Sequence, residues 1–237
     1  MIENEVYWHL SIFVIGIVLA YLFYLKEKKR SADLEKASSM LGLSYKRYLP
    51  NRGFGPFSGI LQNYAPVKAE VLLPETQIAK AGKWKRVTNL LEGERNGRHW
   101  QIFDYAYTLA FGKKVHRQTT YVSRLHKSIP AFSVRPEGIF DKIGDAFKKN
   151  DIDLPDSPGF SKKYYLQGEN KEEVKKLFSP ELTSILEKSK EKFVIESDGK
   201  KIVLFVPEKL TRPNELLSEF ERASRIFNIF DPKRTDF

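Results

Sequence analysis

The first thirty residues divide sharply into an apolar run and a basic cluster. Val6 to Leu25 is apolar apart from His9 and Ser11. Four cations follow within five positions: Lys26, Lys28, Lys29 and Arg30. A run of about 20 residues, at roughly 1.5 Å per residue, matches a hydrocarbon core of about 30 Å. The pattern predicts one transmembrane helix with a basic stop, occupying residues 1–30.

The flanking charges predict how this helix is oriented. The leading segment, Met1-Ile2-Glu3-Asn4-Glu5, is acidic, and no small-residue cleavage pattern follows the apolar run, which disfavours a cleaved signal peptide. Positively charged flanks stay on the cytoplasmic side of a membrane. We therefore expect a single-pass protein of a bacterial inner membrane, with its N-terminus outside and its large C-terminal part in the cytoplasm.

One stripe of the apolar run carries small residues. His9, Phe13, Gly16 and Ala20 recur at spacings of four, three and four, so they share one helix face. Gly16 and Ala20 form a small-xxx-small pair that lets a second helix approach closely. These four residues are the candidate docking site for a partner helix. Two alternatives stay open: an ordinary single span, and ligation of a haem or quinone by His9, which lies about one turn from the interface.

Positive charge is concentrated in the middle of the chain. The 237 residues carry a net charge of +10, and residues 80–127 hold eleven Lys and Arg against three acids. Each cation near an anionic lipid surface contributes about 1 kcal/mol of attraction. We expect a basic face toward the lipid headgroups, formed by Lys26, Lys28, Lys29, Arg30, Lys83, Lys85, Arg86, Lys113, Lys114 and Arg117. Nucleic acid is the weaker alternative polyanion.

Alternation and turn signals predict an α+β domain after the anchor. Residues 31–66 read as a short helix with Leu34, Ala37, Met40 and Leu41 on its apolar side, followed by a glycine-rich connector. Residues 67–150 read as an antiparallel meander plus a helix. The expected strands are 67–73, 86–95, 98–110, 114–124 and 131–135, and the expected helix is 139–149. Asn96-Gly97 suits a type I′ hairpin turn.

The last segment, 151–237, repeats this mixture of elements. We expect a strand at 163–167, helices at 171–178 and 180–187, a hairpin over 193–206 and a final helix at 213–230. Asp198-Gly199 is the second pair that suits a type I′ turn. Because 67–150 and 163–230 both combine sheet and helix, two similar halves are one alternative. In the strand 98–110 the more aromatic face, with Phe103, Tyr105 and Tyr107, is expected to point inward.

No motif in the sequence predicts a catalytic, metal or cofactor site. The absence of cysteine excludes thiolate chemistry and disulfides. The remaining candidates, His99, His116, His126, the Asp151/Asp153/Asp156 cluster and the glycine-rich 53–59, lack the spacing of zinc, calcium and phosphate sites. We therefore expect no cofactor, no metal and no catalytic residue.

Four stretches of the chain carry a family resemblance. They are Phe103–Thr108, Gln118–Thr120, Pro130–Glu137 and Asp141–Gly144. In the order of these stretches and in their residues, the chain resembles uncharacterised bacterial proteins that have one N-terminal span and a cytoplasmic domain of unknown function. The resemblance covers residues 35–230 and implies a bacterial, membrane-anchored protein, with no catalytic residues to carry over.

Together these features predict a non-catalytic binding or assembly module, an accessory subunit of a larger membrane protein complex. Its expected partners are membrane lipid and other membrane subunits. The first alternative is a membrane-tethered enzyme whose acids and histidines assemble across the fold, for instance Asp104, Glu137 and His116. The second is a nucleic-acid-binding tether, in which aromatic side chains among the bases stack on nucleotides.

Overall fold

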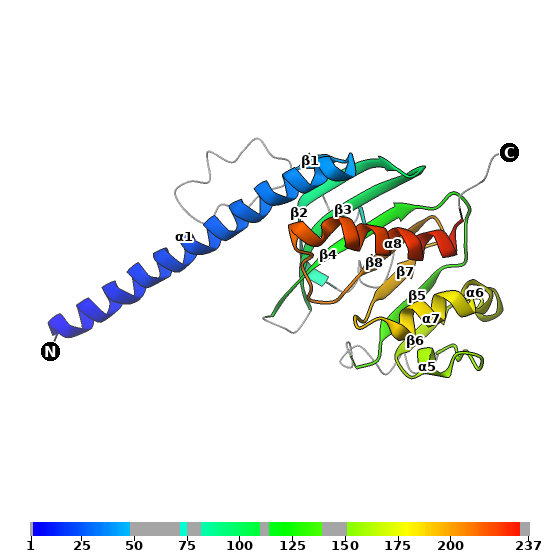
Figure 1. The fold of residues 1–237 in the computed structure, drawn as a ribbon. Coiled ribbons are helices and arrows are strands. Elements are labelled where there is room, and N and C mark those ends of the chain that lie inside the picture. The colour runs from blue at the N-terminus through cyan, green and yellow to red at the C-terminus, as the bar shows by residue number, and fades with distance from the viewer. Residues whose placement is uncertain (1, 48–71, 75–81, 110–113, 139–150, 233–237) are drawn as a thin grey trace.

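One continuous helix, α1 (Ile2–Leu41), joins the apolar run to the domain. The computed structural model describes residues 2–47, 72–74, 82–109, 114–138 and 151–232 (Figure 1). Among them one stretch, Tyr7–Leu41, contains an 18-residue window apolar enough to cross a membrane, with a mean hydropathy of 2.0. The two expected helices merge because residues 26–31 contain neither glycine nor proline to interrupt them.

Eight antiparallel strands form a single sheet, which confirms the α+β architecture. The strands are β1 (Ser44–Lys46), β2 (Gly82–Arg95), β3 (Arg98–Leu109), β4 (Val115–Arg124), β5 (Phe132–Pro136), β6 (Tyr164–Gly168), β7 (Val194–Ser197) and β8 (Lys201–Phe205). Their order in the sheet is β1-β2-β3-β4-β8-β7-β5-β6. Strands β2, β3 and β4 form the expected meander, and β1 pairs with the outer side of β2, so β1 to β4 lie in the sheet in chain order.

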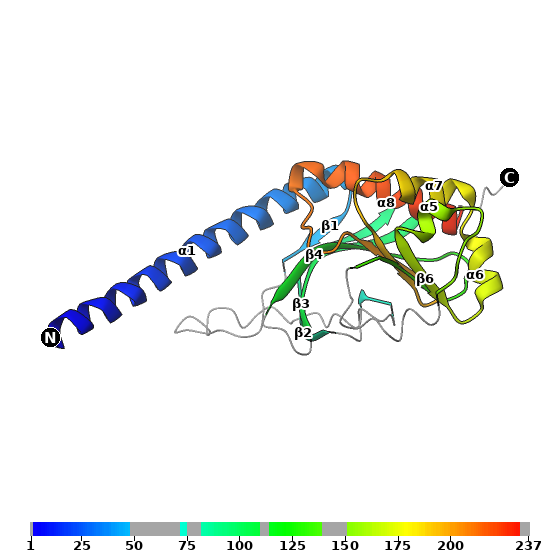
Figure 2. The same ribbon diagram turned by 90° about the horizontal axis from the view of Figure 1, so that it is seen from below.

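The described helices of the domain gather on one face of this sheet (Figure 2). They are α5 (Pro158–Ser161), α6 (Lys171–Leu177), α7 (Pro180–Lys188), the 3₁₀ turn η2 (Pro213–Glu215) and α8 (Leu216–Phe230). Capping side chains start two of them. The Ser179 hydroxyl accepts the backbone N–H of Leu182, and Asn170 accepts that of Glu173.

The strand order corrects the expected position of β5. It does not extend the meander, because the β7–β8 hairpin lies between it and β4. β4 pairs with β8, as in Tyr121↔Leu204, and β5 pairs with β7 and β6. The two segments that were candidates for similar halves therefore contribute to one interleaved sheet.

The two expected hairpin turns differ in type. Asn96 and Gly97 have φ values of 55° and 69° between the paired residues Arg95 and Arg98, which is the type I′ turn predicted. In the second hairpin only Gly199 of the pair has a positive φ, and the last pair is Ser197↔Ile202. The Asp198 carboxylate accepts the backbone N–H groups of residues 200 and 201 instead. That prediction of turn type was wrong.

Both faces of the sheet are buried. Toward the helices, Trp100 packs against Phe220 and Phe227 of α8, with ring centroids 4.7 and 5.3 Å apart. On the opposite face Phe103 and Tyr105 belong to a second buried cluster. The expectation of one inward face was therefore incomplete, because the Trp100 face is buried as well.

The C-terminal half of α1 packs as the sequence predicts at three of four positions. Leu34, Ala37 and Leu41 are buried, whereas Met40 is 69% exposed. The expected glycine-rich connector 50–66, residues 67–71 of the expected strand 67–73 and the expected helix 139–149 lie outside the described residues. Leu72 and Leu73, which are described, are not part of a strand.

Candidate functional site

Polar side chains meet where α1 crosses the helix-facing side of β2, β3 and β4. Arg30 of α1 and Asp104 of β3 form a two-point ion pair there. The Nε and Nη2 atoms of Arg30 donate to the two carboxylate oxygens, each at 2.8 Å. Nη1 donates to the backbone oxygen of Thr211 at 2.9 Å. This planar fork holds the two side chains in one fixed geometry.

This pairing corrects the expected role of Arg30. Its side chain is 15% exposed and that of Asp104 is 9% exposed. A guanidinium that is bonded into the domain on three sides is not free to contact lipid headgroups. Arg30 therefore belongs to the contact between helix and sheet and not to the expected basic face.

Asn89 joins the ion pair from a bulge in β2. The register of β2 and β3 shifts between Thr88 and Leu91, and Asn89 has a φ of 54°, a conformation that asparagine adopts more readily than most residues. Its Nδ2 donates to Asp104 at 2.9 Å. Its Oδ1 accepts the hydroxyl groups of Ser31 and Tyr45, both at 2.8 Å. One buried amide thus connects α1, β1, β2 and β3.

β4 and the segment before η2 complete the arrangement. The Thr119 hydroxyl donates to Asp104 and accepts the backbone N–H of Thr211, both at 2.9 Å. The hydroxyl groups of Thr211 and Tyr121 lie 3.0 Å apart. We call Arg30, Ser31, Asn89, Asp104, Thr119 and Thr211 the junction network. Because Asp104 already accepts bonds from Arg30, Asn89 and Thr119, it serves to hold the helix and is poorly placed to act as a base.

A second row of polar groups lies one step nearer the N-terminal end of α1. Arg86, Ala106 and Arg117 are register partners on β2, β3 and β4, and we call them the arginine row. The Arg117 guanidinium is 3.4 Å from the Glu27 carboxylate and 5.0 Å from the centre of the Phe23 ring. The Nε atom of Arg86 is buried and has no hydrogen-bond partner among the described residues.

The electrostatics of the arginine row follow from this geometry. Burial lowers the pKa of Arg86, and the positive charge of Arg117 lowers it further, while Glu27 opposes the change. Arg86 is therefore a cation that has lost part of its hydration and bonds no acid in the part of the chain that the structure describes.

Most of the expected basic residues lie at this same end of the sheet. The start of β2 and the start of β4 both pair with the end of β3, as in Lys85↔Tyr107 and Thr108↔Val115. Lys114 is exposed and bonds Glu208. Lys26, Lys28 and Lys29 are exposed on α1. Lys113 and the side chain of Lys83 lie outside the described residues. The face as a lipid contact stays a prediction.

The expected docking stripe lies on the part of α1 that projects beyond the sheet (Figure 1). His9, Phe13, Gly16 and Ala20 are all exposed. A Cβ atom placed on Gly16 would meet no atom within 4 Å. Docking of a partner helix and ligation by His9 both stay predictions.

The structure does not bring together the three residues offered for an enzyme. Asp104 faces α1. His116 faces the other side of the sheet, where its ring stacks on Tyr107 at 5.2 Å and bonds Glu208 at 2.9 Å. Glu137 is exposed beyond the end of β5 and accepts the Tyr165 hydroxyl. This combination was therefore wrong as a single site.

Within the described ranges no group of three His, Cys, Asp or Glu residues is placed to hold a metal ion. His99 is 3.9 Å from Glu92, and His126 is 2.9 Å from Asp231, so each histidine has its own carboxylate. Asp151 accepts the backbone N–H groups of Ile152 and Leu166 and so shapes its loop.

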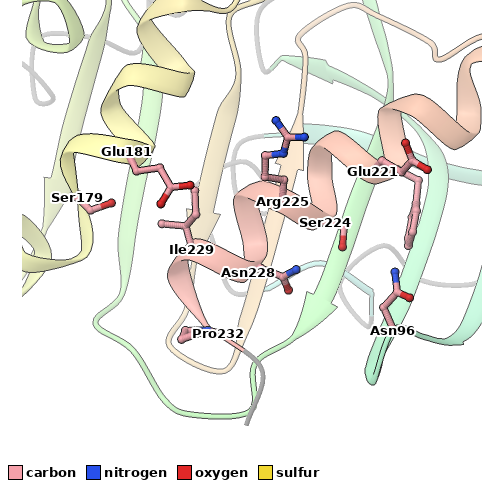
Figure 3. A pocket seen from close by; sticks show the side chains of 10 residues that line it. Asn96, Ser179, Glu181, Glu221, Ser224, Arg225, Asn228, Ile229 and Pro232 are labelled. Carbon is pink, nitrogen blue, oxygen red and sulfur yellow. The ribbon is translucent and has the colours of Figure 1, made fainter. Parts of the chain in front are cut away.

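A broad polar groove lies beside α8 (Figure 3). Its volume is about 730 Å³, and residues of α8, the start of α7 and the tip of the β2–β3 hairpin line it. Glu181, Glu221 and Arg225 point in different directions along it (Figure 3). Ligand pockets are usually enclosed and mostly apolar, so this groove is better suited to contact with a polar surface.

Sequence reasoning did not anticipate the junction network. Two signals stood in the sequence: Asn89 precedes the apolar pair Leu90-Leu91, and Asp104 lies between Phe103 and Tyr105. Polar residues in strands that are buried on both faces need buried partners. The identity of the partner could not be found, because Arg30 is 74 positions from Asp104.

The chain shows a distant likeness to a solved structure, the mycobacterial trehalose monomycolate transport factor A. The two share 10% identity with a TM-score of 0.49, over 84% of this chain and 93% of that chain. No protein-family model and no curated protein matches the sequence. Function is therefore inferred from the residues of this chain.

Proposed function

We propose that this protein is a single-pass, membrane-anchored assembly module, an accessory subunit of a larger complex in a bacterial inner membrane. In this proposal α1 spans the bilayer and the domain lies in the cytoplasm. The observation that carries it is the junction network, which fixes the angle between the helix and the sheet.

The first support is the exposure of the apolar part of α1. The large apolar side chains of residues 7–25 are between 40% and 67% exposed, on a helix that the domain does not cover. Apolar surface of this extent calls for lipid or another apolar partner. The cations at 26–30 favour the cytoplasm for the side that carries the domain.

The second support is the stiffness of the connection. A domain that only has to stay near a membrane needs no more than a flexible linker. Here the helix continues without a break into the domain, buries Leu34 and Leu41, and bonds three strands through Arg30 and Ser31. Such a junction gives each face of the domain a fixed direction relative to the bilayer, which is what docking onto fixed neighbouring subunits requires.

The test is purification of the full chain from its native membranes in a mild detergent, followed by mass spectrometry of the proteins that co-purify. We expect one or more membrane proteins in stoichiometric amounts. Gly16→Leu would place a bulky side chain in the docking stripe and reduce their recovery several-fold, because close helix approach needs the small residue. Val18→Leu, on the opposite face of the helix, is the matched control.

Two outcomes contradict the proposal. Recovery of the full chain alone, at native expression and in several detergents, would remove the role of accessory subunit. Equal recovery of partners with Gly16→Leu and Val18→Leu would remove the docking stripe.

A further inference from the structure

The arginine row lies at the boundary between the hydrocarbon core of a bilayer and its headgroup layer. This step rests on the proposed function, in which α1 spans the membrane. The apolar run ends at Leu25, so Phe23 is within one turn of the boundary. The Arg117 guanidinium stands 5.0 Å from the Phe23 ring centre. β4 therefore begins beside the headgroup layer and not in open cytoplasm.

The row has the shape of a two-armed anion site. Arg86 and Arg117 flank Ala106 across three neighbouring strands. The short side chain between them leaves a hollow of about 20 Å³, which Glu27 and Thr88 also line. A space of that size holds about one oxygen atom. A phosphate with one oxygen in the hollow would leave its esterified side outside, toward the lipid.

The charge balance of the row is positive. Arg30 and Asp104 neutralise each other in the junction network. Glu27 is the acid beside the row and contacts Arg117 at 3.4 Å. Arg86 has a buried Nε atom that bonds none of the described residues. One cationic donor therefore remains unmatched, and an anion that accepts a bond from it would relieve the cost of its burial.

We propose that Arg86 and Arg117 bind the phosphate of an anionic phospholipid in the leaflet next to the domain. Guanidinium groups suit phosphate because their planar donors match its oxygens. The lipid source follows from the apolar surface of α1 beside the row, along which acyl chains can lie. An anionic headgroup is favoured over phosphatidylcholine, whose terminal cation would meet Lys26 and the arginines.

The test is native mass spectrometry of the full chain in a nonionic detergent, titrated with phosphatidylglycerol. We expect Arg86→Gln and Arg117→Gln each to weaken binding of the first lipid about fivefold, and the double variant to weaken it more. Lys176→Gln removes an exposed cation on α6, far from α1, and should change nothing. Ala106→Val keeps both charges but fills the hollow, and should also weaken binding. Thermal melts confirm that each variant is folded.

Three results would overturn the inference: unchanged phosphatidylglycerol binding in the double variant, equal binding of phosphatidylcholine, or displacement of the lipid by millimolar inorganic phosphate. The last would show a site for free phosphate. This assay reads lipid binding and not partner recovery. Loss of partners with arginine-dependent lipid binding would defeat the proposed function alone, and the reverse result would defeat this inference alone.

Discussion

Asp104 is the residue on which the junction between helix and sheet converges. Its carboxylate accepts bonds from Arg30, Asn89 and Thr119 while only 9% of its side chain is exposed. A charge removed from water is tolerated when donors of this kind replace its hydration. The ion pair therefore specifies where the helix binds, and its net contribution to stability is smaller than the cost of removing one partner alone.

Replacing Asp104 alone should cost more stability than the ion pair contributes. Asp104→Asn leaves the Arg30 guanidinium without its counter-charge, and we expect it to lower the free energy of unfolding by about 3 kcal/mol. The measurement is urea unfolding of the full chain in detergent micelles. Glu215→Gln breaks an exposed pair with Arg212 and should cost about 0.5 kcal/mol or less.

A double replacement tests whether the loss of stability comes from an unpaired charge or from altered packing at the two positions. Arg30→Met with Asp104→Leu removes both charges and keeps apolar volume, so it should recover much of the loss seen with Asp104→Asn. A double variant that is less stable than Asp104→Asn would contradict this account of the pair.

Among the elements, α8 is tied to the β2–β3 hairpin at its C-terminal end. Asp231 follows the last turn of α8 and bonds Arg98, the first residue of β3, at 3.0 Å. The same carboxylate accepts the backbone N–H and a ring nitrogen of His126. Burial alone would raise the pKa of Asp231, but these bonds and the charge of Arg98 lower it below its ordinary value of 3.8.

That pKa predicts how acid weakens the attachment of α8. Because the native carboxylate holds its proton less tightly than the unfolded one, its contribution is full above about pH 5 and is lost as the pH falls through the native pKa. Asp231→Asn should lower the free energy of unfolding by about 3 kcal/mol at pH 6, because it leaves the buried Arg98 without its counter-charge. The difference in free energy of unfolding between the wild type and Asp231→Asn should then become smaller toward pH 3.

The measurement is the free energy of unfolding from pH 6 to pH 3. Glu172→Gln, at an exposed i, i+3 pair on α6, is the control and should track the wild type throughout. A gap between wild type and Asp231→Asn that is constant over this range would show that the carboxylate does not titrate as argued.

Elements governed by neighbouring residues could be predicted, and their partners in the sheet could not. Asn96-Gly97 fixes its own turn because both residues accept positive φ. Asp198-Gly199 looks the same in sequence, but the Asp198 carboxylate caps the following N–H groups and selects another turn. Alternation revealed β5, yet nothing in its residues tells that it pairs with β6 and β7 in place of β4.

At the scale of the whole molecule, the sequence predicts which part of the chain is basic, and the structure shows which acids these basic residues bond. The composition of residues 80–127 indicated a basic surface, and the meander does bring 85–86 and 114–117 to one end of the sheet. Arg30 was misplaced because its pairing with Asp104 depends on the tertiary fold. Charge counted along a chain predicts a surface only for residues that do not find buried partners.

The junction network should make helix and domain move as one body, and the cysteine-free chain allows a direct test. Spin labels at Leu22→Cys on α1 and Lys176→Cys on α6 report one distance in nanodiscs, without background labelling. We expect a narrow distance distribution, because the helix is continuous and the bonds from Arg30 to Asp104 and from Ser31 to Asn89 fix its angle to the sheet. Adding Asp104→Asn and Asn89→Ala should broaden it, whereas Glu215→Gln should not. A broad distribution in the otherwise unaltered chain would mean that the domain swings freely, and a module that swings freely cannot present fixed faces to its neighbours.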